Sequence, residues 1–333
     1  MDERAAIAAI RRGLGLPREV NADFGAFSVT HPSRVFASVD HARYGAPPGE
    51  PLAVWAHRAI GAALSDMACC GADAVYAQID LQIPRTADAT AVEEIGHGVR
   101  TAITVYDCTL LNGNNLTVQH DGAFKLTTAV HGISAVERVS PPGRVGARGG
   151  HLVGCTRLPG RFNAALRQLN SSRKSAGVDA GALLGGLAEL AVGRALVASG
   201  AASALLDLND ALLLGAMDLA HASRVEVQLS MDTAIHTVTE DVTLDDILAP
   251  PSGDLALLFT AAPDRWHDAC AAITAAGGSP VQIGLCASGA PRVTLHGCSD
   301  DDLHELAALV WRPTPEFAYP STAVLTALSN LTG

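Results

Sequence analysis

Apolar residues follow two different periods along the chain, and together they predict a mixture of helices and strands. Residues 34–40 alternate between apolar and polar positions, as in a half-buried strand. Residues 53–70 instead place apolar side chains three and four positions apart, as on one face of a helix, and Gly71 suits the end of that helix. Further on we predict strands at 74–83, 109–111 and 125–134 and a helix from Asp88, as its N-cap, to about Val105.

The second half of the chain repeats this style after a Pro- and Gly-containing linker at 140–143. We therefore divide the chain into domains at 1–145 and 146–333, and the mixture of elements fits two α+β domains. The polar segment 157–180 is predicted to be a mobile loop. Strands are expected at 151–155, 202–208, 254–260, 280–285 and 292–296, and helices at 181–199, 210–223, 264–276 and 302–311.

Composition narrows the class of protein. Of the 333 residues, 48% are hydrophobic and only 17% are charged, which favours a compact globular protein over a disordered one. The formal net charge of −11 disfavours binding to nucleic acid or to an anionic membrane surface. The N-terminal residues show no signal-peptide pattern, and the longest apolar stretch is interrupted by charges. Seven cysteines without CxxC pairs favour a reduced, cytoplasmic protein.

Several common catalytic motifs are missing from the sequence. It contains no P-loop, no GxGxxG after a strand, no HExxH and no GxSxG. What it offers instead is a set of aspartates at the ends of predicted elements, without His or Cys company. Carboxylates alone suit Mg²⁺, which prefers oxygen ligands and often binds together with substrate phosphates. These aspartates are Asp23, Asp40, Asp66, Asp207 and Asp210.

Each of these aspartates also has a simpler interpretation as a helix cap or an exposed turn residue. Asp210, directly before an apolar helical run, is the best example of a possible N-cap. For any one aspartate taken alone, we weigh the capping interpretation above the metal-binding one.

Seven segments, taken in order, resemble motifs of the superfamily that contains aminoimidazole-ribonucleotide (AIR) synthetase and thiamine-monophosphate kinase, with the kinase closer. The segment 62–72 is similar to the kinase motif A-x-N-L-S-D-x-A-x-M-G-A, and 252–260 is similar to its G-G-E-D-Y-E-L-L-F-T strand. The other five segments, 21–26, 37–40, 112–115, 150–156 and 207–212, resemble its remaining motifs at matching spacing.

The resemblance implies a two-domain α+β fold in which two N-terminal domains pair into a β-barrel across a homodimer. It also implies ATP and Mg²⁺ in a cleft near that interface. By position, Asp23, Asp40, Asp66, Asp207 and Asp210 become metal ligands, with Asp66 and Asp210 in catalytic roles. Asp40, Asn114, Arg144 and Arg148 become contacts to the nucleotide.

Some positions depart from the kinase pattern. Asn114 replaces an aspartate of the GGDT turn, so a metal there should bind more weakly. Phe24 replaces the second aspartate of GDD, and Ala211 replaces a glycine at the second-domain junction. Gly253 stands where the family has the acid of GGE. The motifs implied for nucleotide and metal binding are therefore mostly present, whereas those implied for binding the substrate are changed.

Three functions follow from this pattern. The first is an ATP- and Mg²⁺-dependent kinase acting on a small molecule other than thiamine monophosphate. The second is a ligase or cyclase like AIR synthetase, which activates an amide by phosphorylation. The third is a degenerate homologue that binds a nucleotide without turnover. The mass of the product and a thermal-shift titration with Mg-ATP would separate them.

Overall fold

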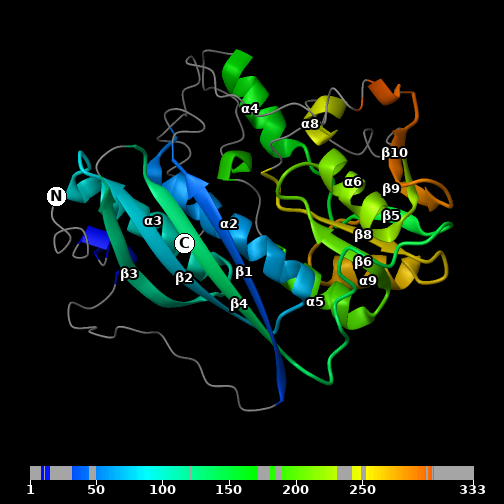
Figure 1. The fold of residues 1–333 in the computed structure, drawn as a ribbon, viewed down its shortest axis with the longest axis horizontal. Helices are drawn as coiled ribbons and strands as arrows, with labels where there is room; N and C mark the ends of the chain where they lie inside the picture. The colour runs from blue at the N-terminus through cyan, green and yellow to red at the C-terminus, as the bar shows by residue number, and fades with distance from the viewer. Residues whose placement is uncertain are drawn as a thin grey trace.

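The structure is a computed structural model. It describes residues 9–10, 12–15, 32–44, 50–119, 122–171, 181–184, 189–230, 242–248, 253–297, 299–301 and 303. These residues fold into two separate sheets with helices packed against them (Figure 1). The mixed α+β class predicted from the sequence is therefore confirmed.

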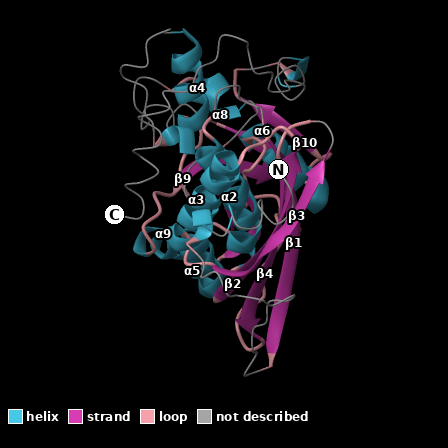
Figure 2. Cartoon of the chain, turned by 90° about the vertical axis from the view of Figure 1, so that its left-hand side faces the viewer, coloured by secondary structure: helices cyan, strands magenta, loops and turns pink. Residues whose placement is uncertain are grey.

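The first sheet has four strands in the order β1-β4-β2-β3. Strand β4 pairs antiparallel with both β1 and β2, while β3 pairs parallel with β2 through the crossover helix α3. Helices α2 and α3 lie on one side of this sheet (Figure 2). The elements are β1 (Ser33–Arg43), α2 (Leu52–Cys70), β2 (Ala74–Pro84), α3 (Ala89–Val105), β3 (Thr109–Gln119) and β4 (Lys125–Ala135).

The second sheet has six strands in the order β10-β7-β9-β5-β8-β6. It forms the right-hand part of the molecule in Figure 1. Its strands are β5 (Leu152–Cys155), β6 (Ala202–Asp207), β7 (Glu226–Leu229), β8 (Leu257–Ala261), β9 (Val281–Ala287) and β10 (Arg292–Leu295). Its helices are α4 (Arg161–Ser171), the short 3₁₀ turn η1 (Ala182–Leu184), α5 (Leu190–Ser199), α6 (Leu212–Ser223), α8 (Leu244–Leu248) and α9 (Trp266–Ala275).

One hydrophobic core joins the two halves. It contains α2 and the inner face of the first sheet together with α5, β8 and α9 of the second half, and a second core fills the space around α6. Helices α2 and α5 approach closely because α5 carries Gly193 at the contact. A Cβ atom built on Gly193 would lie 2.0 Å from the carbonyl oxygen of Ala68, so any side chain there would push the helices apart.

Most of the predicted elements are confirmed, with shifts of a few residues at their ends. Gly71 ends α2 with φ of 63°, and Asp88 caps α3 by accepting a hydrogen bond from the Ala91 amide at 2.8 Å. The two sheets are separated between Ala135 and Leu152, and the proposed boundary at 145 falls in that interval but stays a prediction. Within the described residues, no helix is long and apolar enough to cross a membrane.

Three predicted segments are corrected. The turn expected at 112–115 is part of the continuous strand β3, which bulges against β2 there, because Asn and Gly suit a β-bulge as well as a turn. The loop expected at 157–180 contains helix α4. The helix expected at 181–199 is a 3₁₀ turn followed, from Leu190, by α5. The helix expected at 302–311 lies almost entirely outside the described residues.

Adding a methyl group at Gly193 tests the helix contact. Gly193→Ala would gain up to about 1 kcal/mol in helix propensity on an exposed surface. Here the new Cβ meets backbone atoms of Ala68 that cannot turn away, so we expect a net loss of roughly 1–3 kcal/mol in the free energy of unfolding. Urea denaturation measures it, with Ala198→Ser on the exposed side of α5 as the control. A more stable Gly193→Ala variant would contradict the close contact.

His57 in α2 predicts a specific loss of stability in acid. Its side chain is fully buried and stacked on Tyr106, with ring centroids 5.6 Å apart. Burial lowers the pKa of His57 from 6.5 to about 4, assisted by the charge of Arg58. The unfolded chain therefore takes up a proton that the folded protein refuses, and the free energy of unfolding falls as the pH drops from 6.5 toward 4.

Replacing the imidazole with a ring that does not titrate should remove the contribution of His57 to the pH dependence of unfolding. As the pH falls from about 8 to about 5, we expect the free energy of unfolding of His57→Phe to rise by roughly 2 kcal/mol relative to that of the parent, because of the lowered pKa of His57. Urea denaturation of both proteins at the two pH values gives the difference. Parallel pH dependences would show that His57 is readily protonated in the folded protein.

Candidate active site

The β6–α6 junction presents Asp207 and Asp210 at the edge of the second sheet. Asp207 is the last residue of β6, and Asp210 follows in the turn. Helix α6 begins after Ala211, and among the described residues no amide of its first turn bonds to the Asp210 carboxylate. The interpretation of Asp210 as a helix cap is therefore wrong, and this exposed side chain is left available for another role.

Two serine–aspartate hydrogen bonds connect the junction to the first sheet through α2. Ser65 donates to Oδ2 of Asp207 at 2.5 Å, which joins α2 to β6. The next residue, Asp66, accepts a hydrogen bond from Ser38 of β1, also at 2.5 Å. Two neighbouring residues of α2 thus connect the middle of β1 with the end of β6.

Four of the five predicted aspartates lie within electrostatic reach of one another. Burial raises the pKa of Asp40, and the charges of Asp66 and Asp210 raise it further. Burial also raises the pKa of Asp207, against the bond from Ser65, and the Asp66 charge adds to the rise. Carboxylates from β1, α2, β6 and the following turn therefore form one acidic cluster, which we define as Asp40, Asp66, Asp207 and Asp210. Asp23 lies outside the described residues.

A cavity of about 420 Å³ opens beside this cluster. Asp40 and Asp210 line it from the two halves of the molecule, and Asn209 and Gly253 also reach it. Its apolar lining comes from Trp55, Ala59, Ala62 and Leu255, and its basic groups are Arg43 and Arg58, with His41 beside them.

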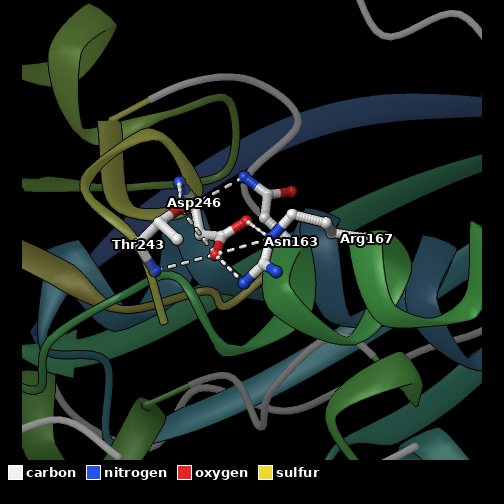
Figure 3. A network of polar contacts seen from close by, with 4 residues as sticks. All are labelled: Asn163, Arg167, Thr243 and Asp246. Carbon is white, nitrogen blue, oxygen red and sulfur yellow. Dashed lines mark hydrogen bonds and ion pairs between the residues drawn. The ribbon is translucent and has the colours of Figure 1, made fainter. Parts of the chain in front are cut away.

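Helix α4 lies beside the cavity, because its Phe162 packs against the lining residues Arg58 and Gly253. Two aspartates from other segments hold this helix, one at its start and one at Arg167. Asp254 accepts hydrogen bonds from the amides of Gly160, at 2.7 Å, and Phe162, at 3.3 Å, and so caps the helix. Asp246 binds Arg167 with an N–O distance of 2.7 Å, and Asn163 donates to its backbone carbonyl (Figure 3). A segment that reads as a polar loop is therefore held as a helix by two buried aspartates, Asp246 and Asp254.

The packing of Phe162 explains one departure in the sequence. A Cβ atom built on Gly253 would lie 2.8 Å from the Phe162 ring. The ring thus occupies the space that a side chain at 253 would need. With Phe162 only 1% exposed, the glycine is required by its neighbour in this structure.

The predicted nucleotide contacts are placed less uniformly. Arg144 forms an ion pair with Asp218 at 2.9 Å. Its charge also offsets part of the rise in the pKa of Asp207. Arg148 lies near His151, whose pKa is lowered by burial and by the Arg148 charge, and does not line the cavity. Asn114 lies in β3, but its side chain is outside the described part. These three assignments stay predictions.

The donor chemistry of the acidic cluster fits Mg²⁺, although the described side chains are not gathered around one point. No group of three or more His, Cys, Asp or Glu side chains in the described part of the chain has the arrangement of a metal site. Mg²⁺ keeps several waters and commonly takes only one or two carboxylates together with substrate phosphates. An all-oxygen cluster with two members on the cavity meets that requirement.

Sequence reasoning missed Trp55, Arg58 and Glu50. Trp55, Arg58, Ala59 and Ala62 share one side of α2, at the spacing that brings helical residues onto one face. That face continues to Asp66, so an arginine on the same helical face as the key aspartate was the available signal. Glu50 precedes the helix and gave no such signal.

Comparison with known proteins finds a family and a relative that this chain resembles. Residues 22–134 match the family described as AIR synthase related protein, N-terminal domain. A thiamine-monophosphate kinase from Halobacterium salinarum is 29% identical over 303 residues, which make up 89% of this chain and 96% of the relative.

Solved structures with low sequence identity share the fold. A thiamine-monophosphate kinase from Stenotrophomonas maltophilia has a TM-score of 0.72 at 21% identity, covering 88% of this chain and 96% of its own. The hydrogenase maturation protein HypE from E. coli has a TM-score of 0.72 at 15% identity, covering 95% and 100%. AaThiL, solved in complex with AMPPCP and TMP, has a TM-score of 0.65 at 21% identity, covering 88% and 92%.

Family match, relative and fold agree with the motifs found in the sequence. The chain is therefore similar to thiamine-monophosphate kinases and to other AIR synthase-related proteins, and its residues 22–134 match the N-terminal domain of that family.

Proposed function

We propose that this protein is an ATP- and Mg²⁺-dependent phosphotransferase that acts on a small molecule other than thiamine monophosphate. The observation that carries the proposal is the cavity where Asp40 of the first sheet and Asp210 of the second half face the same space. The likeness to a thiamine-monophosphate kinase, and to AaThiL with AMPPCP and TMP, supports ATP as the phosphate donor.

The acidic cluster would hold the metal. Asp40, Asp207 and the catalytic pair Asp66 and Asp210 would supply oxygen ligands, together with Asp23. When bound, Mg²⁺ would offset both the repulsion among these carboxylates and the negative charge of the transferred phosphoryl group. Ser38 and Ser65 orient Asp66 and Asp207 by direct hydrogen bonds, so the carboxylates keep their places when the site is filled.

The region around Gly253 favours an acceptor other than thiamine monophosphate. The acid of the kinase motif is absent there, and the Phe162 ring fills the space beside Gly253. The loss of an acid at a position that lines the cavity changes which acceptor fits, while the acidic cluster can still serve the nucleotide.

We further propose that the protein is a cytoplasmic homodimer. The side of the first sheet opposite α2 and α3 carries apolar residues that no described element covers, and Val35 and Val39 of β1 are 56% and 66% exposed. Their neighbours on β4 are Ile133 and Ala129. A second copy would bury this face and complete a barrel. The six described cysteines are all unpaired, as expected in a reducing compartment.

Removing a charge from the acidic cluster tests the site. We expect Asp66→Asn and Asp210→Asn each to lower the rate of ADP formation from Mg-ATP roughly 10- to 100-fold in the presence of a working acceptor, since ligand-sphere changes in metal sites have such effects. Asp268→Asn, at an exposed position of α9, is the control. Unchanged rates in both variants would refute the assignment, and the product mass distinguishes a kinase from a ligase or cyclase.

A charge placed on the open sheet face tests the dimer. We expect Val39→Asp to shift the protein from dimer to monomer in light scattering after gel filtration, because an unpaired carboxylate is costly to bury in an interface. Val145→Asp is a matched control, since Val145 is also 66% exposed but lies in the linker. A parent protein that is monomeric at micromolar concentration would contradict the proposal.

A further inference from the structure

Helix α2 and strand β1 run side by side in opposite directions along the cavity. Ser38 bonds to Asp66 at one end, and the rings of Tyr44 and Trp55 pack edge to face at the other, with centroids 5.6 Å apart. Residues 40 and 43 of β1 therefore follow the same line as residues 66 and 58 of α2. Eight helical residues separate Asp66 from Arg58, which corresponds to about 12 Å along the axis.

Charge changes sign along that line. The acidic cluster occupies one end, while Arg43 and Arg58 line the other, next to Trp55. A phosphoryl group held by metal at the acidic end leaves the basic end free for a different part of the bound molecules. The positions of Asp66 and Arg58 are separated by about two turns of α2.

Arg58 is fixed in place by contacts on two sides. Its Nη1 lies 2.5 Å from Oε1 of Glu50, and its guanidinium carbon lies 4.7 Å from the centre of the Phe162 ring. The side chain retains 21% exposure, and it lines the cavity. An arginine held this way loses little freedom when it binds an anion, because its planar donor group is already oriented.

Glu50 is the buried partner that holds Arg58. Its side chain is fully buried, and Oε2 has no hydrogen-bond partner among the described residues. Burial raises the pKa of Glu50 to about 7, although Arg58 lowers it. Tyr44 donates to the Glu50 backbone carbonyl at 2.6 Å, which fixes the start of α2. A buried ion pair of this kind adds little to stability by itself, so the placement of Arg58 is its more specific consequence.

We propose that Arg58 binds an anionic group of the phosphate acceptor, remote from the atom that receives the phosphate, and that Glu50 is the positioning residue for Arg58. The acceptor is thus a small molecule with a carboxylate or phosphate at one end and an apolar part that fits between Trp55 and Leu255. This inference rests on the proposed function only in naming the ligand an acceptor, since anion binding needs no turnover.

Three probes of similar size test the inference by calorimetry. Phenyl phosphate and benzoate carry the anion and benzyl alcohol does not. We expect the anionic probes to bind the parent protein and benzyl alcohol to bind at least tenfold more weakly. Arg58→Gln should weaken binding of the anions about tenfold or more, as expected for loss of a charged hydrogen bond. Arg58→Lys should recover part of the loss, and Glu50→Gln should weaken binding to a smaller degree.

Arg12→Gln is the matched control, because Arg12 forms an Arg–Glu ion pair with Glu93 in the same half, at 3.1 Å, away from the cavity. It should bind all probes like the parent. Mg-ATP should bind Arg58→Gln within about twofold of the parent affinity. Thermal midpoints confirm that each variant is folded. If Arg58→Gln does not fold, the Arg58 side-chain resonance of isotope-labelled parent protein should shift on adding phenyl phosphate.

Each outcome decides the inference. It is overturned if the parent binds neither anion, if Arg58→Gln binds them like the parent, or if that variant loses Mg-ATP and anions to the same degree. If the parent does not bind Mg-ATP while Arg58→Gln loses the anions, the proposed function fails and the anion site stands.

Discussion

The site depends on one geometric constraint, which is that α2 must lie close to β1 and β6 at the same time. Ser65 and Asp66 are adjacent in the sequence, yet they bond to strands of two different sheets. This is possible only because α2 is packed between the halves, against the sheet on one side and against α5 on the other. Gly193 permits the second contact by allowing backbone to approach backbone.

The negative charges of the acidic cluster are destabilised by burial and by their repulsion of one another. Burial and mutual repulsion raise the pKa values of Asp40 and Asp207, so their charged forms are disfavoured in the absence of a cation. The same surroundings raise the pKa of Cys69 well above its usual value, with burial as the main cause and Asp207 and Asp66 adding to it. Cys69 is therefore held as a thiol at neutral pH, and the carboxylates are the groups of this region that are suited to bind a cation.

Local sequence patterns identified most elements because their periods survive in the folded protein. The segments at 53–70 and 125–134 are helix and strand as predicted: the helix is buried on most sides, and the strand alternates between buried and less buried positions. Residues 161–171 were misassigned because α4 is stabilised by Asp246 and Asp254, whose bonded partners lie 79 and 94 positions away in the chain. The aspartates of the site were identified through motifs, whereas Glu50 was not, because a lone acid before a helix becomes informative only beside Arg58. The contacts that fix α4 join residues far apart in the chain, and no local pattern contains them.

The continuous core also limits how the protein can take up its ligands. In many two-domain enzymes the domains rotate about a hinge and close over the substrate. Here α2, α5, β8 and α9 share one core, so such a rotation would have to open apolar packing across the whole boundary. Asp66 and Arg58 lie on the same helix, α2, so the separation of these two positions is set within one element. The shared core therefore opposes a large closing rotation of the two halves around the cavity.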